Sequence, residues 1–256
     1  MQLSLRDPKQ VGGTHSFVRN RYFYGKLLDV HHFELEQDYL NGKRWLLNRL
    51  VSGYGVICGL DVQPAQKGRA VVVTPGIALD RGGREIIVPC TSEPIAVPSR
   101  PAATDTPQQA GCEPEECVHL AICFQQCECD PAPVMVDDCG QVTTCSASSI
   151  QERYKCVIVQ CRAPEITLGS GLTDFVLNGR LNYHALVERV TRGCPELPAD
   201  LCIPLANIRL PPGDEPIEES DIDISPRPIV YGNDLLFDIA LALAGEAPPR
   251  NRGGKS

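Results

Sequence analysis

Cysteine is the residue type in this sequence whose number and spacing most invite chemistry. The chain has 13 cysteines in 256 residues, and five of them fall between positions 123 and 145. Thiolates bind Zn²⁺ tetrahedrally, and a bound metal can hold folded a long loop that has little core of its own. The zinc candidates are Cys123, Cys127, Cys129 and Cys139, although their spacing lacks the C-x2-C pairs of a zinc knuckle.

Two other interpretations of the thiols stay open in the sequence. Cysteines in predicted strands, such as Cys156, are expected to remain reduced and to pack as small apolar side chains. Others would form disulfides if the protein ends outside the cell, and Cys194 and Cys202, joined by a Pro-containing loop, are the pair expected first. Because the total is odd, at least one cysteine has no partner within the chain.

Other groups of polar residues carry less chemistry. His32 and Glu36 are four residues apart on a predicted helix and could form one edge of a metal site, but two ligands are too few. The sequence contains no G-x-S-x-G elbow, P-loop, dinucleotide fingerprint or H-E-x-x-H motif. His119 and His184 are the histidines left as candidates for a catalytic base. We therefore expect a protein that is not an enzyme.

Composition argues against two further classes, namely nucleic-acid-binding proteins and proteins with a membrane-spanning helix. The formal net charge of −8 and the isoelectric point near 5.2 oppose binding to a nucleic-acid backbone. No apolar run approaches the roughly 20 residues of a membrane-spanning helix. The N-terminus lacks the apolar segment of a secretion signal, so we expect cytoplasmic assembly without a signal peptide.

The elements that position these residues begin with an extended N-terminal arm over residues 1–28. Its aromatic segment contains Arg21, Tyr22, Phe23 and Tyr24. Because the arm has no helical or strand period, its partners must lie elsewhere on the fold or on a neighbouring subunit. These four residues are therefore the first interface candidates.

Residues 29–97 are predicted to form a helix followed by a small β domain. Asp29 is a suitable N-cap for the helix, and Gly53 is suited to end it. The apolar positions of the helix are Leu40, Leu47 and Val51, flanked by Phe33, Leu46 and Leu50. Five short strand candidates follow up to residue 97, bounded by Pro, Gly and Asp as in a small barrel or sandwich.

A second β-rich region is predicted over residues 98–232. It contains a cysteine-rich loop over 125–149 and a helix over 181–192. We therefore expect a β-rich α+β fold in which an N-terminal arm and helix are followed by a small β-barrel or sandwich, further strands and two short helices.

The last of these helices is predicted over 233–245. Leu236, Ile239 and Leu243 share its apolar face, which makes them the second set of interface candidates. The tail over 246–256 is rich in Pro, Arg and Gly, and we expect it to be disordered.

Two blocks of sequence, in this order, resemble a known family. The first runs from Arg21–Val30 (RYFYGKLLDV) through residues 33–41 and 44–50 to Gly53–Val62, and the second joins Val73–Asp80 to Gly83–Val88. Together they resemble an uncharacterised family of structural proteins associated with extracellular contractile injection systems, which are phage-tail-like particles. The resemblance does not extend to the cysteine-rich loop and implies no role for it.

The resemblance implies a structural role at the baseplate, cap or fibre attachment of such a particle. It implies other contractile-particle proteins as partners, and a released particle would place the chain outside the cell. We also expect a homo-oligomer, because exchange of the arm would bury aromatic residues against a neighbouring subunit. One alternative is a fibre-type receptor- or glycan-binding module, which the presence of a single tryptophan, Trp45, weakens. Another is a zinc-stabilised interaction domain.

Overall fold

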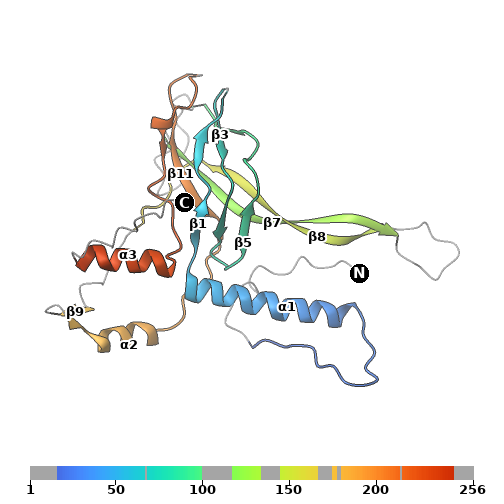
Figure 1. Cartoon of the computed structure of the whole chain (residues 1–256). Helices are drawn as coiled ribbons and strands as arrows, with labels where there is room; N and C mark the ends of the chain where they lie inside the picture. The colour runs from blue at the N-terminus through green and yellow to red at the C-terminus, as the bar shows by residue number, and fades with distance from the viewer. Residues whose placement is uncertain are drawn as a thin grey trace, which may run out of the picture.

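A computed structural model describes residues 16–66, 68–99, 117–133, 145–166, 175–177, 180–213 and 215–244. Its elements are α1 (Val30–Leu47), a π-turn (Asn48–Ser52), β1 (Gly55–Gly59), β2 (Val62–Pro64), β3 (Ala70–Val73), β4 (Gly76–Leu79), β5 (Glu85–Val88), β6 (Ile95–Ala96), β7 (Cys117–Pro133), β8 (Cys145–Val159), β9 (Val176–Leu177), β10 (Arg180–Leu181), α2 (Tyr183–Thr191), β11 (Ile203–Arg209), a 3-10 turn (Glu219–Asp221), β12 (Ile222–Asp223) and α3 (Asn233–Ala244). Figure 1 shows an upright β body, a long two-stranded ribbon projecting from it and helices at its base.

The β body is built from open antiparallel sheets around one hydrophobic core. The strand orders are β1-β4-β5, β2-β3-β6 and β12-β11-β7-β8. Val71 and Val73 of β3 are fully buried while the residues between and before them are less so, as expected for a strand with one face on the core. The β-rich α+β class is confirmed, and the described strands do not close into a barrel.

The core draws on strands from both predicted β-rich regions. Val56, Ile86 and Val88 from the first region lie in the same buried cluster as Leu120 and Leu205 from the second. β11 is buried at every residue except Arg209, and Ile203, Leu205, Ala206 and Ile208 belong to the core cluster. Burial of these aliphatic side chains is the main force that holds the two regions together.

A buried carboxylate holds the turn between β4 and β5. Asp80 is fully buried and accepts hydrogen bonds from the backbone N–H groups of Gly82 and Arg84, both at 2.8 Å. It also accepts one from Arg84 Nε at 2.6 Å. These charge-assisted bonds offset the cost of removing the carboxylate from water.

The same turn receives the C-terminal end of α1. A Cβ atom at Gly83 would lie 2.0 Å from the carbonyl oxygen of Trp45, and Gly83 has a φ of +89°, so glycine is required there. Asn48 Nδ2 donates to Gly83 O and to Glu85 Oε1, both at 2.9 Å. Arg44 Nε lies 3.1 Å from Glu85 Oε1. The helix is thereby fastened to the β body at one end.

The rest of α1 lies outside the core. It begins as predicted, with a capping box between Asp29 and His32, and the π-turn that follows it ends at Gly53, which has a φ of +81°. Gly42 is the one buried residue within α1. The apolar residues Leu40 and Leu47 are each 61% exposed. An apolar face that normally packs on a core is therefore left open to solvent.

β7 and β8 form the ribbon. They pair continuously from His119 and Val159 to Pro133 and Cys145, whereas β11 accompanies β7 only from Cys117 to Ile122. The predicted loop over 125–149 is therefore wrong for residues 125–133 and 145–149, which are strand. Residues 134–144 lie outside the described residues. The sequence concealed these strands because, with solvent on both faces, their residues show no apolar alternation.

The C-terminal segment returns to the β body beside β1. Val56 N donates to Pro228 O at 2.8 Å, and Val230 N donates to Val56 O at 2.9 Å. This bridge places α3 at the base of the body, near α2 and the attached end of α1 (Figure 1).

Both predicted C-terminal helices are present, with slightly shorter bounds. The helix expected over 181–192 forms as α2, and the helix expected over 233–245 forms as α3. Residues 1–15 of the arm and the predicted disordered tail over 246–256 lie outside the described residues.

Substitution of Asp80→Ala is expected to lower the free energy of unfolding by roughly 2–4 kcal/mol, because three donors lose their buried acceptor. Asp200→Ala is the matched control, since Asp200 is exposed and accepts one hydrogen bond, from Cys202 N at 3.0 Å. Equilibrium denaturation measures both values. Equal losses in the two variants would contradict the assigned role of Asp80.

Candidate functional site: exposed apolar surfaces and cysteines

The described part of the arm folds back along α1 and presents an aromatic loop at its tip. Phe17 packs edge-on against Tyr39, with 6.5 Å between the ring centroids, and Tyr22 Oη donates to a carboxylate oxygen of Glu36. Phe23 remains 62% exposed. The arm thus contacts its own helix, which the sequence left open as an alternative to exchange with a neighbour.

The loop at the tip is ordered by its own polar contacts. Lys26 Nζ donates to the carbonyl oxygen of Arg21 at 3.1 Å and lies 6.0 Å from the ring centroid of Phe23. Lys26 N donates to Phe23 O at 3.1 Å, which closes a turn around Tyr24 and Gly25. The side chain of Tyr24 is fully exposed and does not pack on the core. Preorganisation of this kind reduces the entropy lost when a loop binds.

The second set of predicted interface residues is also exposed. In α3, Leu236 is 48% exposed, Ile239 36% and Leu243 84%. Figure 1 places α3 at the base of the β body and the aromatic loop near the free end of α1, so the two sets lie at opposite ends of α1. The structure therefore does not bring them together into one site.

The disulfide lies elsewhere than predicted. Cys202 is bonded to Cys123, not to Cys194, which is an exposed free thiol. The cause is strand register: Ile203 of β11 lies opposite Ile122 of β7, so the next positions outward, Cys202 and Cys123, also face each other, with 4.5 Å between their Cα atoms. Sequence spacing cannot reveal such a pairing, because it depends on how distant strands align.

The zinc candidates are not arranged as a ligand set. Cys123 is consumed by the disulfide, and Cys127 and Cys129 are partly exposed on β7 in the ribbon. Cys139 lies outside the described residues. In the described ranges, no group of three or more His, Cys, Asp or Glu side chains is placed to hold a metal ion.

The histidines identified in the sequence have structural partners. His32 caps α1 together with Asp29, and the hydrogen bonds from His32 hold the pKa of Asp29 below its ordinary value. His119 Nδ1 lies 2.7 Å from the carbonyl oxygen of Cys161, so this nitrogen must carry the proton and cannot accept one from the Cys161 thiol, 4.0 Å away. His184 is exposed and pairs with Glu188 at 3.7 Å.

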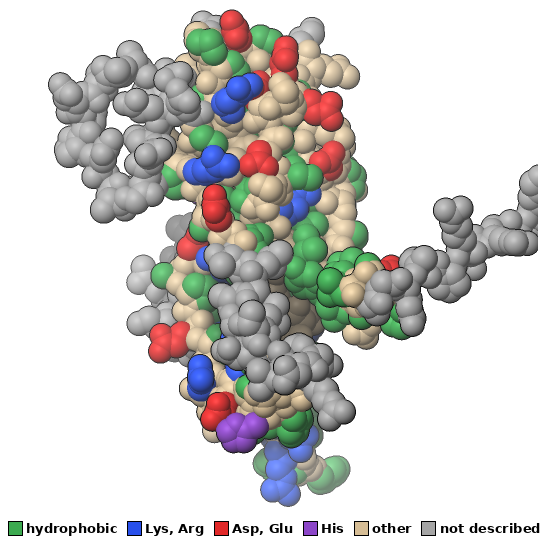
Figure 2. Space-filling view, turned by 90° about the vertical axis from the view of Figure 1, so that its left-hand side faces the viewer, with side chains coloured by type: hydrophobic (Ala, Val, Ile, Leu, Met, Phe, Trp, Pro, Cys, Tyr) green, Lys and Arg blue, Asp and Glu red, His purple; other side chains and the backbone are tan. Residues whose placement is uncertain are grey.

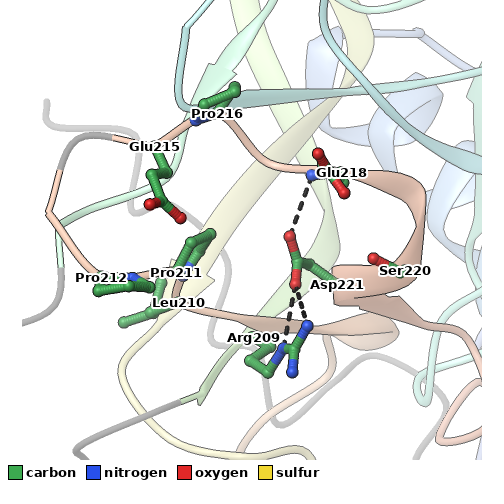
Figure 3. Close-up of a pocket in the computed structure, with 9 residues that line it drawn as sticks. All are labelled: Arg209, Leu210, Pro211, Pro212, Glu215, Pro216, Glu218, Ser220 and Asp221. Carbon is green, nitrogen blue, oxygen red and sulfur yellow. Dashed lines mark hydrogen bonds and ion pairs between the residues drawn. The ribbon is translucent and has the colours of Figure 1, made fainter.

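A cavity of about 430 Å³ lies beside the end of β11 (Figure 3). Its walls include three prolines and the ion pair in which Asp221 Oδ1 accepts from Arg209 Nε at 3.0 Å and Nη2 at 2.7 Å. Burial opposes the ionisation of Asp221, but the hydrogen bonds from Glu218 N and Arg209 outweigh it and hold the pKa of this carboxyl below its ordinary value. Arg209 and Asp221 thus neutralise each other, while Glu215 and Glu218 add two further acidic side chains to the cavity wall.

Neither positive nor negative charge dominates the face of the molecule that carries α2 and α3. Figure 2 shows acidic and basic side chains interspersed there, with hydrophobic side chains between them. Over the part of the chain that the structure describes, no helix is long and apolar enough to cross a membrane.

Comparison of the sequence with models of known protein families and with curated proteins gives no match.

Substitution of Cys202→Ser is expected to lower the free energy of unfolding by about 4 kcal/mol, because the disulfide closes a span of 79 residues. Cys194→Ser should leave it unchanged, since Cys194 is free and exposed. Denaturation without reductant measures the difference, and added reductant should remove it. A loss of stability in Cys194→Ser alone would contradict the observed pairing.

The Cys156 thiol is expected to react slowly with alkylating reagents. Burial raises the pKa of Cys156 to about 11, so roughly a thousandth of it is thiolate at pH 8. Because the thiolate is the reactive form, its labelling rate should rise with pH up to that value. Peptide mapping after iodoacetamide treatment at pH 8 should show Cys156 labelled at least about tenfold more slowly than the exposed Cys145. Equal rates would show that the partial burial of Cys156 does not protect its thiol.

Proposed function

We propose that this chain is a non-enzymatic structural subunit of a phage-tail-like contractile injection particle. In this proposal it joins other tail components through the aromatic loop of its N-terminal arm, and α3 supplies a second contact. The assignment to such a particle rests on the resemblance of the two blocks between Arg21 and Val88, and the mode of attachment rests on the exposed surfaces.

The observation that carries the proposal is the exposed aromatic loop. Phe23, Tyr24 and Leu27 are 62%, 105% and 87% exposed, although the loop is tied to α1 by Tyr22 and closed by Lys26. Aromatic side chains held in a fixed loop are the residues that most often dominate binding energy at protein interfaces. Large apolar side chains exposed together also favour association over a monomer in solution.

The absence of a catalytic arrangement among the described residues fits a structural role. The imidazole of His119 donates to a backbone carbonyl, and Arg209 in the wall of the cavity beside β11 is paired with Asp221. Trp45, the single tryptophan, contributes its backbone to the contact with Gly83 and lies at the junction of helix and hairpin. This position gives little support to a glycan-binding surface built on tryptophan.

The proposal is tested in the source organism with a tagged full-length chain. The chain should co-sediment with isolated tail-like particles, and the double substitution Phe23→Ser and Tyr24→Ser should lower its incorporation at least about tenfold, because two aromatic anchors are lost. The matched control is Tyr183→Ser, since Tyr183 is 73% exposed on α2, away from the loop.

Two results would overturn this assignment. One is a chain that never sediments with a particle, and the other is a double variant that is incorporated as efficiently as the unaltered chain.

A further inference from the structure

α1 exposes a line of residues that are alternately three and four positions apart. We call them the exposed heptad seam, and they are Val30, Phe33, Gln37, Leu40, Arg44, Leu47 and, in the following π-turn, Val51. The apolar members are between 53% and 79% exposed. Apolar residues with this 3.5-residue period are typical of a helix that pairs with another helix.

The contacts that α1 makes with its own chain lie on other faces of the helix. Phe17 lies over Gly42, where an added Cβ would meet its ring at 2.7 Å, and packs against Tyr39. Near the C-terminal end, Gly83 approaches the backbone of Trp45. In heptad terms these contacts lie on the back and flanks of the helix, so within the described residues the seam itself stays open.

We propose that the exposed heptad seam binds the same seam of a second copy of this chain, with the two α1 helices antiparallel. Such a contact is isologous, so one surface serves both subunits and the assembly closes as a dimer. The inference goes beyond the proposed function and does not rest on it, because a particle subunit need not dimerise and a dimer need not belong to a particle.

Charge on the seam favours the antiparallel orientation. In a parallel pair, seam positions face their own equivalents, so Arg44 would lie opposite Arg44 of the second copy. An antiparallel pair can be aligned with Gln37 facing Leu40 of the second copy. Arg44 then lies against Phe33 of the second copy, where a guanidinium and an aromatic ring attract each other.

The positions that flank the seam favour the same orientation. Glu36 and Lys43 are seven residues apart on one flank of α1. The antiparallel alignment brings Glu36 of each copy beside Lys43 of the other, so the dimer gains two opposite-charge pairs. A parallel alignment would place Glu36 beside Asn41 instead. The seam of one copy therefore matches that of a second copy in the spacing of its apolar residues, and the flanks match in charge.

A second copy fits the seam better than a lipid surface does. The flanks carry the acidic residues Glu34 and Glu36, whereas helices that lie on membranes favour Lys and Arg on their polar face. α1 has 18 residues and is about 27 Å long, so the contact is short for a protein interface. We therefore expect a concentration-dependent dimer rather than a permanent one.

Sedimentation velocity of the full-length chain tests the inference, with free thiols alkylated so that disulfide exchange cannot contribute. A monomer–dimer equilibrium should appear between roughly 1 and 200 µM. Leu40→Glu should weaken it at least about 100-fold, because each dimer loses two buried leucines. Leu181→Glu, at a leucine 66% exposed outside α1, should leave it unchanged. Circular dichroism checks that both variants remain folded.

A charge exchange tests the orientation separately. Glu36→Lys and Lys43→Glu should each weaken the dimer about threefold to tenfold, and the two together should restore it to within roughly twofold. A chain that stays monomeric throughout, a dimer that Leu40→Glu leaves intact, or a double variant without recovery would overturn the inference. Leu40→Glu separates the two proposals, because it removes the dimer contact without touching the aromatic loop, whereas Glu36→Lys also removes the acceptor of Tyr22 Oη.

Discussion

The hydrophobic core of the β body is the constraint on which the rest of the described structure depends. Strands from both halves of the chain contribute to it, and the close approach of Gly83 to the α1 backbone fastens the helix to it at one end. The described part of the arm, most of α1, the far part of the ribbon (residues 125–133 and 145–153) and α3 lie outside this core. Large apolar side chains in these elements are exposed within the described residues, and such surfaces are typical of protein interfaces.

Elements with a clear local signal could be predicted from the sequence. Asp29 and Gly53 marked the ends of α1 and its π-turn because capping is a local property of the backbone. The short strands between residues 55 and 97 followed from apolar runs bounded by turn residues. The extension of the ribbon over residues 125–133 and 145–149 was missed, since strands with solvent on both faces have no apolar alternation to detect.

Contacts between distant segments could not be predicted in the same way. The exposed aromatic loop was identified from composition, but the position of Tyr22 against Glu36 depends on the arm folding back along α1. The bond between Cys123 and Cys202 depends on the register of β7 with β11, which no spacing within the sequence encodes. The heptad spacing of α1 is visible in the sequence, but its exposure follows only from the fold.

A cryo-EM map of the isolated particle tests the central claim most directly, namely that the surfaces left outside the core are interfaces. The account predicts density for this chain in which residues 22–28 are buried against a neighbouring subunit. A map in which the chain is present but this loop faces solvent, or a particle that lacks the chain, would contradict it.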